Sequence, residues 1–168
     1  MVSQDRPNSD SRPAVGPGRI LALDVGSRTI GTAVTDPLGI TAQGLETIRR
    51  ANKKTDFAAL WRIIHDYDIR EIVVGLPLRM SGQQGTQSEK MTALDEQLRT
   101  KFKLPVHLWD ERLTSAEANR ILRDSEISIQ KRAAAVDQLA AVLILQGFMA
   151  HRSAMRQQPE PPGTGVTE

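Results

Sequence analysis

The sequence contains no cysteine, so a disulfide framework and a thiolate zinc site are both excluded. It also lacks any apolar run near the roughly 20 residues that cross a bilayer, because charged residues interrupt every candidate. Residues 1–17 are polar and proline-containing, without the apolar segment of a secretory signal. We therefore expect a cytoplasmic protein.

An excess of one charge sign is also missing. Lysine and arginine number 22 against 20 aspartates and glutamates, which leaves a net charge of +2. That excess alone does not indicate a nucleic-acid partner. The basic residues do cluster, at Arg49–Lys54 and at Lys131–Arg132, but such clusters are as typical of a solvated face as of a phosphate-binding one.

The length of 168 residues suits one domain with a sizeable core. The segments 1–17 and 157–168 are rich in proline and polar residues, and we expect both to be disordered tails. The folded domain should therefore cover residues 18–156.

Within that domain, hydrophobic periodicity predicts an α/β fold. Short apolar runs predict strands at 20–23, 30–35, 41–49, 71–75 and 105–109. Helical spacing predicts helices at 57–65, 87–101 and 133–149, and a capping box predicts a further helix start at 114–117. The first three strands are close enough to form an antiparallel meander, and the later strands alternate with helices. We expect a mixed five-stranded sheet with helices packed on it, and Trp61 and Trp109 in its core.

Acidic residues occupy three places where apolar ones would be expected. Asp24 ends the first apolar strand, and Asp137 lies on a small, apolar helical face. Asp110 and Glu111 directly follow the strand at 105–109. Functional groups gather at the carboxyl ends of strands in open α/β sheets. Because neighbouring strand residues point to opposite faces, the pattern alone does not decide between Asp110 and Glu111.

If these carboxylates converge, they need a counter-charge. The repulsion between two carboxylates about 4 Å apart is roughly 4 kcal/mol at an effective dielectric of 20. The ligands would be hard carboxylate oxygens, and the sequence has no cysteine, so Mg²⁺ or Mn²⁺ is favoured. Such a cluster would suit two-metal hydrolysis. Taken singly, each acid has another interpretation: an Asx-turn at Asp24, a buried ion pair at Asp137, and a surface charge triplet at 110–112.

Four segments resemble the motifs of the YqgF family of pre-16S ribosomal RNA nucleases, also described as Holliday-junction-resolvase-like. They are Leu21–Val34, Ile72–Leu78, Asp110–Ser115 and Val136–Leu145, in the family's order. The resemblance implies a ribonuclease H-like fold and a metal-dependent nuclease site. It places the catalytic, metal-binding acids on Asp24, Glu111 and Asp137, with Mg²⁺ or Mn²⁺ as the cofactor.

The resemblance also implies a role in maturing the 5′ end of 16S ribosomal RNA, with precursor rRNA and the small ribosomal subunit as partners. Branched DNA is an alternative substrate for the same metal site, and a non-catalytic RNA-binding assembly factor is an alternative function. Ser81 departs from the family pattern, which often has an acid there, so we expect no metal ligand in that loop.

Residues beside the acids are candidate contacts to the substrate. Gly26 lacks a side chain next to Asp24, which would let a phosphate approach closely. Arg112 could orient Glu111 or hold a phosphate, and other basic residues could neutralise the nucleic-acid backbone. The expected substrate-binding residues are Gly26, Arg79, Arg112, Lys131 and Arg132.

Overall fold

The computed structural model describes residues 18–76, 84–110 and 129–157. Within these ranges, the side chains of residue 76 and of residues 84–88 and 129–134 are not described. The expected tail at 1–17, the expected helix start at 114–117 and residues 158–168 lie outside the described part. No helix in the described part of the chain is long and apolar enough to span a membrane.

One mixed sheet organises the described residues. Its strands are β1 (Arg19–Val25), β2 (Thr29–Thr35), β3 (Ala42–Gly44), β4 (Ile48–Arg49), β5 (Ile69–Leu76) and β6 (Val106–Asp110). The order is β3-β2-β1-β5-β6, with β4 also pairing with β2. The pairs β1–β2 and β2–β3 are antiparallel, whereas β1–β5 and β5–β6 are parallel. The expected meander and crossovers are confirmed.

The strand expected at 41–49 is two short strands instead of one, so the sheet has six strands among the described residues and not five. Both short strands pair with β2, but the chain between them leaves the regular ladder. There the Leu45 amide donates to the Thr32 carbonyl, and Thr32 Oγ1 donates to the Glu46 carbonyl. A side-chain hydrogen bond thus replaces part of the ladder.

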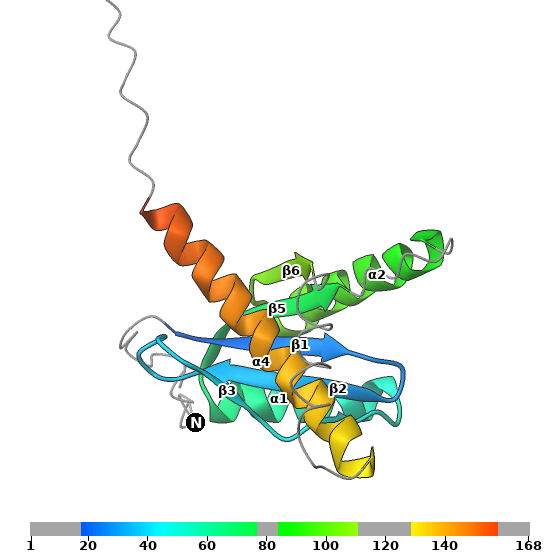
Figure 1. Ribbon diagram of the computed structural model, residues 1–168. Coiled ribbons are helices and arrows are strands. Elements are labelled where there is room, and N and C mark those ends of the chain that lie inside the picture. The colour runs from blue at the N-terminus through cyan, green and yellow to red at the C-terminus, as the bar shows by residue number, and fades with distance from the viewer. Residues whose placement is uncertain (1–17, 77–83, 111–128, 158–168) are drawn as a thin grey trace, which may run out of the picture.

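Helices cover both faces of the sheet. They are α1 (Lys53–Asp66), α2 (Gln84–Phe102) and α4 (Ile129–Arg156). Figure 1 shows α4 crossing one face of the sheet, with α1 and α2 behind it on the other. Asn52 caps α1, because its side chain accepts a hydrogen bond from the Thr55 amide, and Asp56 lies in the first turn. The α/β class is confirmed.

Strand alternation separates the core into two layers. On β1, Leu21 and Leu23 pack with α1 and α2, whereas Ile20 and Ala22 pack with α4. The register of β1 with β2 continues this division, because directly opposed residues share a face. The side of the sheet to which each side chain of β1 and β2 points is therefore known.

The two tryptophans differ from each other. Trp109 is half-buried and meets Phe148 of α4 edge to face, with ring centroids 6.1 Å apart. Trp61 is 56% exposed and stacks on the exposed His65, so its expected place in the core was wrong. Helical spacing finds the apolar stripe of α1, but Trp61 lies at the stripe's edge, where the ring faces outward.

A polar cluster joins the C-terminal half of α4 to the sheet. Arg152 donates two hydrogen bonds to Glu71 of β5, at 3.0 Å to Oε1 and 2.5 Å to Oε2. Nε2 of His107 lies 2.9 Å from Glu71 Oε2. The bonds from Arg152, and then that from His107, hold the pKa of Glu71 below its ordinary value of 4.5.

This cluster predicts a pH-dependent contribution to stability. Because the folded protein lowers the pKa of Glu71, the contribution is present above about pH 4.5 and is lost as the pH falls through the folded-state pKa. Glu71→Gln should therefore lower the melting temperature by a few degrees at pH 7, and the gap should close in acid. Thermal unfolding of both proteins from pH 3 to pH 7 checks this, and a gap that persists undiminished at pH 3 would contradict it.

Candidate active site

Asp24 lies at the end of β1, on the face that α4 covers. Alternation along the strand puts it in the row of Ile20 and Ala22, both of which pack against α4. Its side chain is half-buried, as expected for a carboxylate at the margin of the core. Directly opposite Asp24 on β2 is Gly31, which shares its face.

Gly31 brings Asp137 to the same place. A Cβ added to Gly31 would lie 2.1 Å from the backbone oxygen of Asp137 and 2.6 Å from its carbonyl carbon. The α4 backbone thus occupies the space that any side chain at this position would need. Asp24 and the backbone of Asp137 are therefore both neighbours of Gly31, although they are far apart in the sequence.

A hydrogen bond fixes the orientation of the Asp137 side chain. Thr29 Oγ1, at the start of β2, donates to Asp137 Oδ2 at 2.5 Å. A hydroxyl donor to a carboxylate is a strong, charge-assisted bond. It occupies one side of Oδ2 and leaves Oδ1 as an oxygen that a cation could bind.

The turn between β1 and β2 carries Gly26 and is held by Arg50, which lies between β4 and α1. The Gly26 amide donates to the Thr29 carbonyl at 2.9 Å, and Gly26 itself is exposed. Arg50 Nη1 donates to the Gly26 carbonyl at 2.8 Å, while Arg50 Nε lies 3.2 Å from Asp56 Oδ2. Arg50 thus links the turn to the first turn of α1. Whether a phosphate approaches Gly26 stays a prediction.

The third acid expected from the sequence comes directly after β6. Glu111 lies outside the described residues. Asp110 is described, and it continues the row of Val106 and Leu108, whose face is opposite to α4. Asp110 is therefore not placed with Asp24 and Asp137. Among the described residues, no group of three acidic or histidine side chains comes together.

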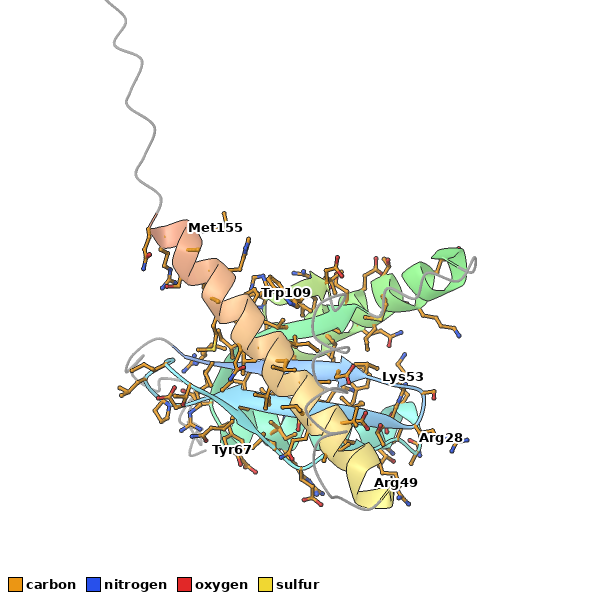
Figure 2. All side chains as sticks on the ribbon, in the orientation of Figure 1. Arg28, Arg49, Lys53, Tyr67, Trp109 and Met155 are labelled. Carbon is orange, nitrogen blue, oxygen red and sulfur yellow. The ribbon has the colours of Figure 1, made fainter. Side chains whose placement is uncertain are left out.

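Four of the expected substrate contacts are not tested by the described residues. Arg79 and Arg112 lie outside them. Lys131 and Arg132 lie in the first turn of α4, and their side chains are not described. Other basic residues do gather near the site: Figure 2 shows Arg28, Arg49 and Lys53 at the end of the sheet where β1 turns into β2, far from Met155.

The chain matches a known family over most of its length. The family model described as RuvX, Holliday junction resolvase, matches residues 18–151. The chain belongs to this family. Its enzyme class is accordingly that of a nuclease, and the resemblance to YqgF proteins is confirmed.

Curated relatives cover nearly all of the same region. A protein of Koribacter versatilis named "Putative pre-16S rRNA nuclease" is 59% identical over 147 residues, which is 88% of this chain and 96% of that protein. A protein of Moorella thermoacetica with the same name is 49% identical over 131 residues, covering 78% of this chain and 94% of its own length.

A solved structure supports the fold. Thermus thermophilus RuvC in complex with a Holliday junction substrate aligns with a TM-score of 0.52 and 13% identity, covering 81% of this chain and 96% of that chain. At this identity the likeness concerns the fold alone. The predicted ribonuclease H-like fold is confirmed.

Three residues that position the site were not among those expected from the sequence. A glycine inside a strand signals close approach of another backbone, so Gly31 could have been found from its place in the run 30–35. Arg50 was counted only as part of a basic cluster. Thr29 offered no signal, since its partner lies 108 positions away.

The Thr29 bond gives a prediction for this family member. Thr29→Val keeps the shape but removes the donor, and we expect kcat/KM to fall about 10- to 100-fold, as when a group supporting a metal ligand is removed. Thr29→Ser keeps the hydroxyl and should retain most activity. Steady-state cleavage by the three proteins checks this. A loss in Thr29→Ser as large as that in Thr29→Val would contradict a role that rests on the hydrogen bond alone.

Proposed function

We propose that this protein is a divalent-metal-dependent nuclease that cuts precursor 16S ribosomal RNA near its 5′ end, in the cytoplasm. The observation that carries the proposal is the approach of Asp137 to Gly31, directly opposite Asp24. The names of the two relatives supply the substrate, and their high coverage supports the transfer. The small ribosomal subunit is the proposed partner.

Asp24, Asp137 and Glu111 are the proposed catalytic metal ligands. Glu111 is chosen over Asp110 because Asp110 continues the row on the face away from α4. The oxygens of Asp24 and Asp137 fit Mg²⁺ or Mn²⁺, which prefer hard oxygen ligands. When bound, such ions activate water and stabilise the leaving oxygen.

The other residues of the site bind and orient. Thr29 holds Asp137 through Oδ2, so that the carboxylate keeps one orientation. Gly26, with Arg50 on its carbonyl, presents an exposed turn without a side chain to a phosphate. Arg79, Arg112, Lys131 and Arg132 are the proposed neutralising contacts to the nucleic-acid backbone.

Branched DNA is the second candidate substrate, because the matching family model is described as a Holliday junction resolvase. The metal site proposed here would serve either substrate. Cleavage of a labelled 16S precursor leader RNA and of a four-way DNA junction, each with Mg²⁺, Mn²⁺ or EDTA, separates the two. Metal-dependent cutting of the RNA with the junction intact supports the proposal, and the reverse preference assigns the enzyme to branched DNA.

The same assay tests the non-catalytic alternative. An RNA-binding assembly factor would bind the leader RNA equally well with Mg²⁺ or EDTA and would cut neither substrate. That outcome, obtained also with the precursor small-subunit particle as substrate, would refute the nuclease proposal.

A further inference from the structure

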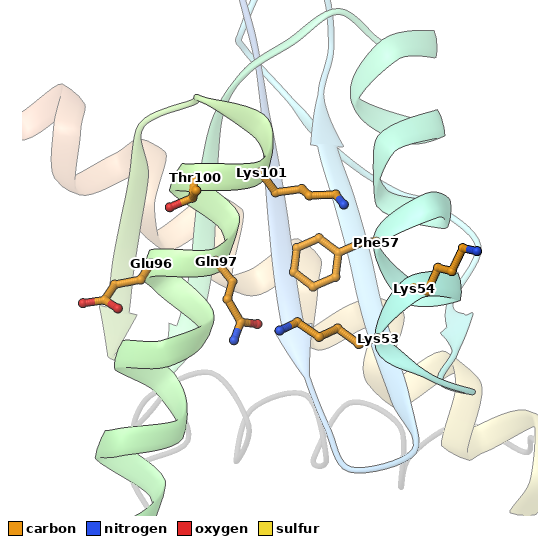
Figure 3. Close-up of a pocket in the computed structure, with 7 residues that line it drawn as sticks. All are labelled: Lys53, Lys54, Phe57, Glu96, Gln97, Thr100 and Lys101. Atoms are coloured by element: carbon orange, nitrogen blue, oxygen red, sulfur yellow. The ribbon is translucent and has the colours of Figure 1, made fainter.

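A cavity on the side of the sheet away from α4 is lined by basic residues. It has a volume of about 780 Å³ and lies between the N-terminal part of α1 and the C-terminal half of α2. Figure 3 shows Lys53 of α1 and Lys101 of α2 reaching toward opposite sides of the Phe57 ring, with Gln97 facing Lys53. The acidic lining residue, Glu96, points away from the ring.

A second hollow lies next to this cavity. This hollow of about 470 Å³ shares Gln97 with the cavity and is also lined by Gly26, Ser27, Arg50 and Lys90. Gly26 and Ser27 belong to the turn that follows Asp24. The two hollows are therefore neighbours around Gln97, and together they reach from the turn that follows Asp24 to Lys53 and Lys101. We call the two hollows together the α1–α2 channel.

Two lysines of the channel, Lys53 and Lys101, have no acidic partner among the described residues. Lys53 and Lys101 are exposed, and none of the ion pairs between described residues involves either of them. Arg50 differs, because it is already bound to Asp56 and to the Gly26 carbonyl. Arg50 thus shapes the channel, while Lys53 and Lys101 offer unneutralised positive charge.

We propose that the α1–α2 channel binds the phosphate backbone of the nucleic-acid substrate beyond the cleaved bond. The proposal rests on the nuclease function above and adds a second contact surface, on the opposite face from Asp137. Lysine ammonium groups act as point charges for phosphate, which suits binding without base specificity. The basic cluster Arg49–Lys54 then has a role beyond solvation.

The shape favours a polynucleotide over a small nucleotide. Phe57 is only 8% exposed and stacks on Phe102, with ring centroids 5.6 Å apart, so it forms the floor and offers no open face to a base. The two hollows also line α1 and α2 as far as the turn that follows Asp24. A backbone leaving the active site meets positive charge along this route.

The test is salt-dependent binding by a double variant. Lys53→Gln with Lys101→Gln should weaken binding of the 16S leader RNA in EDTA. It should also lower the slope of log K against log salt by about 0.7–0.9 for each phosphate that the variant no longer neutralises. The matched control is Arg62→Gln with Arg156→Gln, which removes the same charge from two residues outside the channel. The control should keep the wild-type slope.

Cleavage then separates this proposal from the nuclease proposal. The channel variant should raise KM and leave kcat near wild type, since the contact is made equally in the ground and transition states. If the channel variant lowers the salt slope but the wild type cuts no substrate, the result supports phosphate binding by the channel and rejects the nuclease proposal. An unchanged slope with normal cleavage overturns the channel. Weaker binding of inorganic phosphate or a mononucleotide by the variant, with full RNA affinity retained, would also overturn it and assign the cavity to a small anion.

Discussion

Asp24→Asn and Asp137→Asn are each expected to lower the rate of cleavage by about 10² to 10³-fold, the range observed when one preorganised electrostatic element of an active site is removed. Both substitutions keep the shape of the side chain and remove its charge, so the proposed divalent cation would lose a ligand. Single-turnover cleavage at saturating enzyme measures the effect apart from substrate binding. We expect RNA binding in EDTA to be retained.

Asp110→Asn is the matched control for these variants. It removes one carboxylate at the end of a neighbouring strand, but on the face away from α4. Wild-type cleavage by Asp110→Asn, beside the losses at Asp24 and Asp137, would place the chemistry on the α4 face. A loss at Asp110 as large as that at Asp137 would contradict the assignment of faces.

Gly31→Ala is the second variant with a large expected effect. Its Cβ would lie 2.1 Å from the Asp137 backbone oxygen, and a backbone contact of this kind cannot be relieved by a side-chain rotation. The α4 helix must move away from β2, at a cost of about 1–3 kcal/mol in the free energy of unfolding. Because Asp137 moves with the helix, we expect cleavage to fall further than the loss of folded protein explains. Urea unfolding and cleavage at a temperature where the variant is fully folded measure the two effects.

Gly44→Ala provides the comparison. The nearest atoms to a Cβ at Gly44 belong to the side chain of Gln138, the residue next to Asp137, at 2.6–2.9 Å. The Gln138 side chain can change rotamer, whereas the Asp137 backbone cannot, so we expect a smaller loss of stability than in Gly31→Ala and near-normal cleavage. If Gly31→Ala behaved like Gly44→Ala, the close packing of α4 on β2 would not position Asp137.

The elements with strong periodicity were predictable from the sequence because burial alone dictates them. The run Ile20–Leu23 is apolar on both faces and forms the central strand β1, with α4 on one side and α1 and α2 on the other. Asp24 follows that run and falls, by alternation, on the α4 face. The position of Asp24 at the site's edge was therefore within reach of sequence reasoning.

The contacts between distant elements were not predictable in the same way. Periodicity placed Asp137 on an inward face of its helix. The position of α4 along β2, however, depends on the close contact at Gly31. The hydrogen bond between Thr29 and Asp137 depends in turn on that position. The choice between Asp110 and Glu111 needed the family resemblance, since a strand pattern assigns opposite faces without saying which face is functional. Asp110 lies on the face away from α4, and Glu111 as the third acid stays a prediction.

Calorimetric titration of Mn²⁺ alone into the protein, without nucleic acid, tests most directly whether Asp24 and Asp137 share a divalent cation. We predict saturable binding by the wild type and by Asp110→Asn, and binding weakened at least about tenfold in both Asp24→Asn and Asp137→Asn. Wild-type Mn²⁺ affinity in either Asp24→Asn or Asp137→Asn would contradict a shared cation.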